Sequence, residues 1–96
     1  MASDVSLLVV DPTLNVVVAV RWIGGNGAAE ACRSILLREP TRYEVGYEVW
    51  QHVDPDEVMR IVEQGRYANG LTREETRVLA ERHPPSRCWW SIERDD

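Results

Sequence analysis

Two apolar stretches open the chain, residues 5–10 (VSLLVV) and 15–23 (NVVVAVRWI), separated by DPTL. β-Branched residues favour strands, and the Asp and Pro between the stretches favour a tight reversal, so this pattern predicts a β-hairpin. Both phases of the second stretch are apolar. We expect Val16, Val18, Val20 and Trp22 to lie on the buried face of this strand.

Helical spacing follows in AAEACRSILLRE, where the apolar residues are Ala28, Ala31, Cys32, Ile35 and Leu36. Residues three and four apart share one face of a helix, and Pro40 prevents continuation. The pattern predicts a helix over residues 27–38, with Asn26 as its N-cap.

Residues 41–51 (TRYEVGYEVWQ) alternate in polarity. Tyr43 and Val45 begin one face, and the other face carries Glu44, Glu48 and Trp50. This period of two predicts a single half-buried strand.

Two segments carry the start signals of helices. In DPDEVMRIVEQG, Asp54 is the expected N-cap, Glu57 completes a capping box, and Gly65 ends the helix. In LTREETRVLAERHPP, Thr72 and Glu75 repeat the same arrangement before two prolines.

The last apolar segment, SRCWWSIE, predicts a short strand with Cys88, Trp90 and Ile92 on one face. The expected order is ββαβααβ over residues 1–96. This order predicts a single α+β domain with a mostly antiparallel four-stranded sheet and helices mainly on one face.

Composition narrows the possible partners. The 96 residues include 16 acidic and 11 basic side chains, and the net charge is −5. This charge disfavours binding to nucleic acid or to anionic membranes and favours a protein partner with a basic or mixed surface. All basic residues are Arg, so the chain has no lysine for a P-loop or a Schiff base. A lysine-free composition rich in Arg, Val and Ala also suggests a GC-rich prokaryotic or phage genome.

The apolar run Val16–Val20 is far shorter than the ~20 residues that span a bilayer. Asp4 stands where a signal peptide carries basic residues. We therefore expect a cytoplasmic protein without a membrane segment. Cys32 and Cys88 lack zinc spacing, and we expect two buried reduced thiols, no metal and no cofactor.

The segment RWIGGNGAAEA runs from a strand through glycines into a helix, as phosphate-binding loops do. It lacks the Lys and Ser/Thr of a P-loop, and Glu30 stands where the dinucleotide fingerprint needs a small residue. A structural turn is the expectation, and a small phosphate- or coenzyme-binding enzyme that uses Gly24–Gly27 is an alternative. His52 and His83 have no nearby nucleophile, so the sequence predicts no catalytic constellation.

Four tryptophans are many for a chain of this length. By strand phase, Trp22 and Trp90 belong to the core. Trp50 and Trp89 lie on the polar phase, where they either form a binding surface or close over the sheet edges to complete the core. Tryptophan and arginine are frequent at the energetic centres of protein interfaces.

We therefore expect partner contacts from Trp50, Trp89, Glu44, Glu48 and Arg21. The sequence favours a small acidic, non-enzymatic interaction or inhibitor protein that occupies a partner's surface, in the manner of immunity, antitoxin or anti-defence proteins. A structural homodimer that uses the mixed sheet face is the other alternative.

Overall fold

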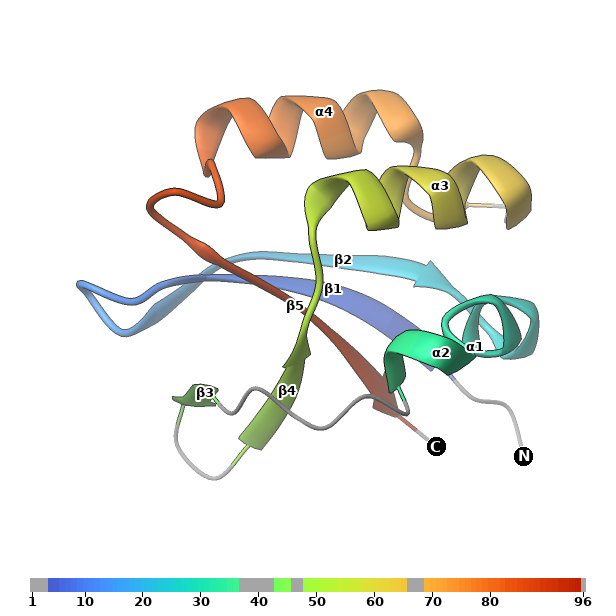
Figure 1. Ribbon diagram of the computed structural model, residues 1–96, viewed down its shortest axis with the longest axis horizontal. Coiled ribbons are helices and arrows are strands. Elements are labelled where there is room, and N and C mark those ends of the chain that lie inside the picture. Colours follow the sequence, from blue (N-terminus) through green and yellow to red (C-terminus); the bar gives the residue numbers. More distant parts are fainter. Residues whose placement is uncertain (1–3, 37–42, 46–47, 66–68, 96) are drawn as a thin grey trace.

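A three-stranded antiparallel sheet forms the centre of the computed structural model (Figure 1). The structure describes residues 4–36, 43–45, 48–65 and 69–95. In the sheet, β1 (Asp4–Asp11) lies between β2 (Val16–Gly24) and β5 (Trp89–Asp95).

Two shorter strands extend the sheet beyond β5. β4 (Glu48–His52) pairs with β5 through two residue pairs, and β3 (Tyr43–Val45) pairs with β4. The strand order in the described part of the chain is β2-β1-β5-β4-β3, which makes β2 an edge strand.

Four helices pack on one face of this sheet. They are α1 (Asn26–Ala31), α2 (Arg33–Leu36), α3 (Pro55–Gly65) and α4 (Arg73–Arg82). Figure 1 shows α3 and α4 beside each other above the strands. Buried side chains from the helices and from β1, β2 and β5 share one core cluster. The protein is thus a small compact α+β structure, as the sequence predicts.

The central strand β1 is apolar on both faces. Its residues Val5, Leu7 and Val9 point into the core beneath the helices. Leu8 and Val10 form a second, smaller cluster on the opposite face with Val17 and Trp89. The twofold alternation of a strand explains this division, because neighbouring side chains point to opposite faces.

Trp90 is fully buried, as its strand phase predicts, and connects three parts of the fold. Its indole Nε1 donates a 2.8 Å hydrogen bond to the carbonyl oxygen of His83, at the end of α4. Its own carbonyl accepts a 3.0 Å bond from the Val53 N–H, directly before α3. It also pairs with Val9 across the sheet.

The capping predictions for α3 and α4 agree with the structure to different degrees. In α4, the hydroxyl of Thr72 accepts a 3.1 Å bond from the Glu75 N–H and donates one of 2.9 Å to Oε1 of Glu75. In α3, the carboxylate of Glu57 accepts a 3.2 Å bond from the Asp54 N–H. The Thr72 cap is confirmed. At α3 the structure shows the Glu57 half of the capping box.

The predicted single helix over residues 27–38 is wrong. The structure has two short helices separated at Cys32, where the Ile35 N–H bonds to the Cys32 carbonyl, and residues 37–38 lie outside the described part. Such an i to i+3 turn brings side chains three apart onto one side, so Cys32 and Ile35 can both be buried. The N-cap is Gly25 and not Asn26, and no side chain caps this helix.

The predicted single strand over residues 41–51 is also wrong, because β3 and β4 pair antiparallel with Tyr43 opposite Trp50 and Val45 opposite Glu48. Alternation continues in the sequence across Gly46, and alternation alone does not distinguish one strand from two. The predicted four-stranded sheet and the order ββαβααβ are therefore not confirmed. The observed order is ββααββααβ.

The buried face of β2 is the opposite of the predicted one. Ala19 and Ile23 are buried beneath the helices, whereas Val16, Val18, Val20 and Trp22 are exposed. Because β2 is an edge strand, Val20 and Trp22 on the face away from the helices have a neighbouring strand on one side only. Periodicity shows that two faces exist and leaves open which of them the helices cover.

Replacing Thr72 by Ala should lower the free energy of unfolding by about 1 kcal/mol, since the first turn of α4 loses its side-chain acceptor. Urea denaturation followed by circular dichroism measures the change. Thr72→Ser keeps the acceptor and should stay near the wild type. Thr13→Ala, in the exposed β1–β2 turn, is the control, and an equal loss in Thr13→Ala and Thr72→Ala would contradict the capping role.

Burial of the Cys32 side chain raises the pKa of its thiol from 9.0 to about 11. In the unfolded chain the thiol ionises near its ordinary pKa, so the stability from the buried neutral thiol is complete below pH 9 and declines towards pH 11. Between these two pH values the free energy of unfolding falls by about 1.4 kcal/mol per pH unit. Urea unfolding at pH 8 and pH 10.5 should show a stability difference between wild type and Cys32→Ala that shrinks with rising pH. A constant difference would overturn this assignment.

Candidate protein-interaction surface

The edge strand β2 exposes four large apolar side chains. The exposed fractions are 49% for Val16, 36% for Val18, 54% for Val20 and 40% for Trp22. We call these four residues the β2 patch. Single exposed apolar residues are common on proteins, whereas neighbouring ones on the same face of a strand are typical of an interaction site.

Register places Val20 and Trp22 on the sheet face away from the helices, whereas Val16 lies opposite Asp11, on the same phase as Val9. Val20 lies opposite Leu8, and Trp22 lies opposite Ser6. Directly paired residues of an antiparallel sheet share a face. Val18 is an extra residue in β2, in the register irregularity between Val9 and Val10 of β1, and such a bulge bends the strand locally.

Trp22 is held in place although it is exposed. Its indole Nε1 donates a 3.1 Å hydrogen bond to the carboxylate of Asp4. This bond restricts the rotation of the ring before any partner arrives, and a fixed side chain loses less entropy on binding than a mobile one. Trp22 therefore has the properties of a preformed anchor.

Two carbonyl groups of β2 have partners outside the β1–β2 ladder. The Trp22 carbonyl accepts a 2.9 Å bond from the Leu71 N–H, and the Val20 carbonyl accepts a 2.8 Å bond from Nη1 of Arg21. Carbonyls two residues apart in a strand point the same way, so both lie at the outer edge of β2. The acceptors that another strand would need at this end are thus already occupied.

The predicted contact residues Arg21 and Trp89 lie on different faces of the sheet. Arg21 pairs with Leu7, which faces the helices, whereas Trp89 pairs with Val10 on the opposite face. The Arg21 side chain is exposed and reaches the strand edge through its bond to Val20. The structure does not bring these two residues into one surface.

Trp89 is half-buried and packs against the cluster of Leu8 and Val10. Its ring also contacts His52, with 5.9 Å between ring centroids and an interplanar angle of 44°. Next to it, Ser91 is buried and its hydroxyl donates a 3.1 Å bond to the Leu8 carbonyl. Trp89 therefore contributes to the packing of the face away from the helices.

The remaining predicted contact residues are Glu44, Glu48 and Trp50. Their backbones belong to β3 and β4, where Glu44 lies opposite Val49 and Trp50 opposite Tyr43. Their side chains lie outside the described part of the structure. Their part in partner contacts stays a prediction.

Three ion pairs between described residues lie on α3 and α4. Arg77 forms ion pairs with Glu74 and Glu81 along α4, and Arg73 of the same helix pairs with Glu63 of α3 at 2.5 Å. The hydrogen bond and charge of Arg77 lower the pKa of Glu74. These exposed pairs keep the helical surface hydrated and contrast with the apolar outer face of β2.

The glycine segment forms the turn between β2 and α1. Gly24 ends the strand, Gly25 is the N-cap of α1, and the Gly25 carbonyl accepts a 3.0 Å bond from the Ala29 N–H. Within the described residues, no group of three or more His, Cys, Asp or Glu side chains is placed to hold a metal ion. None of the described helices has the length and apolarity needed to cross a bilayer.

Comparison with protein-family models, curated proteins and solved structures found no match to this chain.

Sequence analysis did not identify the β2 patch as a surface. Trp22 shares the strand phase of Val16, Val18 and Val20, and this phase predicts a core position for them. The edge position of β2 is what exposes them, and it results from β1 pairing with the distant β5. One local signal could have indicated an exposed apolar surface. The side chains on both faces of residues 16–23 are mostly apolar, and the helices cover only one of these faces.

Two alanine substitutions separate the buried and exposed tryptophans. Trp90→Ala should lose about 3 to 5 kcal/mol, because it leaves a large cavity and removes the bond to His83. Trp22→Ala should lose about 1 kcal/mol, since the indole is partly exposed and its bond to Asp4 lies at the surface. Urea denaturation at one pH measures both. Losses of similar size would contradict the burial described here.

Proposed function

We propose that this chain is a non-enzymatic interaction protein that binds a partner protein through the β2 patch. The observation that carries the proposal is the pair of exposed apolar side chains Val20 and Trp22 on the outer face of β2, in a protein whose helices display paired charges. Its action is to occupy a surface of the partner, as inhibitors of the immunity, antitoxin or anti-defence type do. The free thiols Cys32 and Cys88 agree with work in the cytoplasm.

Binding takes place through side chains and not through addition of a strand at the Val20–Trp22 end. The carbonyls of Val20 and Trp22 already accept hydrogen bonds, and the bulge at Val18 disturbs the edge further. Val20 and Trp22 insert into an apolar depression of the partner. Anchors of this kind commonly contribute about 2 kcal/mol or more each.

The partner surface is apolar at its centre and basic or mixed at its rim. The net charge of −5 attracts a basic surface over a distance and repels acidic ones. Asp4, whose carboxylate holds the indole of Trp22, places a negative charge beside the anchor. A complementary rim therefore carries Arg or Lys opposite Asp4.

Affinity capture with matched variants tests the proposal. Tagged wild type, Val20→Asp and Gln64→Glu are used as bait in a lysate of the source organism, and every captured protein is then purified and titrated by calorimetry. Val20→Asp places a charge in the β2 patch, whereas Gln64→Glu makes the same charge change on exposed α3. We expect the partner to bind wild type and Gln64→Glu equally and Val20→Asp about 30-fold more weakly.

Thermal unfolding of each variant shows that the bait is folded. Equal binding of the partner to wild type and Val20→Asp would show that the β2 patch is not the binding surface. Light scattering over a hundredfold range of concentration tests the structural homodimer. A wild-type dimer that Val20→Asp dissociates, with no other protein captured, would replace the inhibitor function by self-association.

A further inference from the structure

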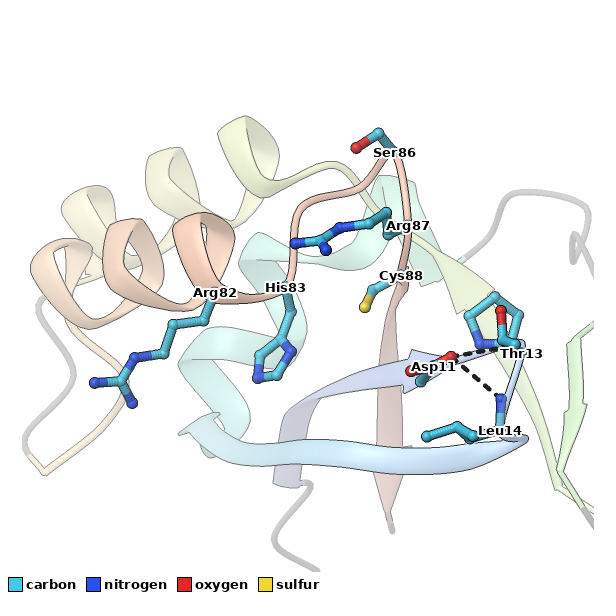
Figure 2. Close-up of a pocket in the computed structure, with 9 residues that line it drawn as sticks. Asp11, Thr13, Leu14, Arg82, His83, Ser86, Arg87 and Cys88 are labelled. Atoms are coloured by element: carbon cyan, nitrogen blue, oxygen red, sulfur yellow. Dashed lines mark hydrogen bonds between the residues drawn. The ribbon is translucent and has the colours of Figure 1, made fainter.

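An open hollow of about 620 Å³ lies between the β1–β2 turn and the segment that follows α4 (Figure 2). Leu14 and Asp11 form one side, and His83, Arg87 and Cys88 form the other. Leu14 is an apolar side chain with 69% of its surface exposed. The hollow is separate from the β2 patch and has no part in the proposed function.

Hydrogen bonds fix both walls of the hollow. The Pro84 carbonyl accepts 2.9 Å bonds from the N–H groups of Arg87 and Cys88, and the buried Trp90 holds the His83 carbonyl. On the other side, the carboxylate of Asp11 accepts bonds from two N–H groups of its own turn. Figure 2 shows these bonds of Asp11 as dashed lines. The backbone of both walls is therefore fixed before a ligand binds.

Arg82 and Arg87 both line this hollow and have no ion pair with a described carboxylate. Arg33, Arg73 and Arg77, in contrast, each pair with a glutamate. In Figure 2 the guanidinium group of Arg82 points away from the hollow, whereas that of Arg87 lies beside His83 and Cys88. Arg87 is thus the cation available to a ligand.

Two negative groups border the hollow. Asp11 is the carboxylate that lines the hollow, and two backbone N–H groups already solvate it. The carboxyl end of α4 adds partial negative charge, which a nearby cation also stabilises. Burial, and to a lesser extent Asp11, raises the pKa of Cys88, so its thiol is neutral and does not repel an anion.

We propose that this hollow binds a small organic oxyanion, in which a carboxylate or a phosphate ester is joined to an apolar group. The guanidinium of Arg87 offers parallel N–H donors that match two oxygens of either anion. The apolar group packs on Leu14, whose exposed side chain then loses contact with water. His83 adds a ring N–H donor at the same wall.

Amide shifts of the ¹⁵N-labelled protein test this site with four probes. Benzoate and phenyl phosphate join an anion to an apolar ring, benzyl alcohol keeps the ring without the charge, and inorganic phosphate keeps the charge without the ring. We expect saturable shifts at Leu14, His83 and Cys88 with the first two probes. Benzyl alcohol and inorganic phosphate should bind at least about tenfold more weakly. The stronger of the two aromatic anions identifies the ligand as a carboxylate or a phosphate.

Arg87→Ala and Arg60→Ala are the matched variants, since both arginines are exposed and Arg60 lies on α3. Arg87→Ala should weaken benzoate or phenyl phosphate about tenfold, and Arg60→Ala should leave binding unchanged. Unchanged binding in Arg87→Ala, or shifts that grow linearly without saturation, would overturn the proposal. If Arg87 only stabilises the end of α4, its loss lowers the melting temperature and leaves the amide shifts as in wild type, which also overturns it.

Discussion

The hydrogen bond from the buried indole of Trp90 to the His83 carbonyl joins the last strand to the end of the last helix. The same residue pairs with Val9 in the central strand and accepts a bond from Val53 before α3. Removal of this side chain would break the bond to the end of α4 and empty a position of the core that the sheet and the helices share. A large aromatic ring with one polar atom suits this position, because the ring fills volume and the N–H pairs with the half-buried His83 carbonyl.

The position of β1 at the centre of the sheet determines which surfaces are left for binding. It has paired strands on both sides, and its apolar residues Leu7 and Leu8 are buried on opposite faces. β2 has only one neighbouring strand, and the helices cover only one of its faces. The outward-facing Val20 and Trp22 are the consequence.

Local rules predicted those parts of the fold that local interactions determine. The first hairpin, α3, α4 and the cap at Thr72 depend on residues close in sequence, and all of them are present. The core position of Trp90 also followed from alternation. The break at Cys32 could not be predicted in this way, because it depends on which side chains the sheet and α3 bury together.

The candidate surface was harder to predict than the fold. Residue type alone predicts that Arg21 and Trp89 belong to one contact surface. The register of β2, β1 and β5 places them on opposite faces of the sheet. The exposed face of β2 depends on the pairing of β1 with β5. In this pairing Leu8 lies opposite Ser91, which is more than eighty positions later in the sequence. Apolar patterns describe how a strand alternates, and the topology decides which phase meets water.

The hydrogen bonds at the outer edge of β2 also bear on aggregation. An exposed apolar strand with free carbonyls is a template on which further strands add, and this growth leads to fibrils. In β2 the side chain of Arg21 and the N–H of Leu71 occupy two of these carbonyls, and the bulge at Val18 twists the edge. A further strand that pairs at the Val20–Trp22 end of β2 would have to displace these two hydrogen bonds, which opposes fibril growth from this end.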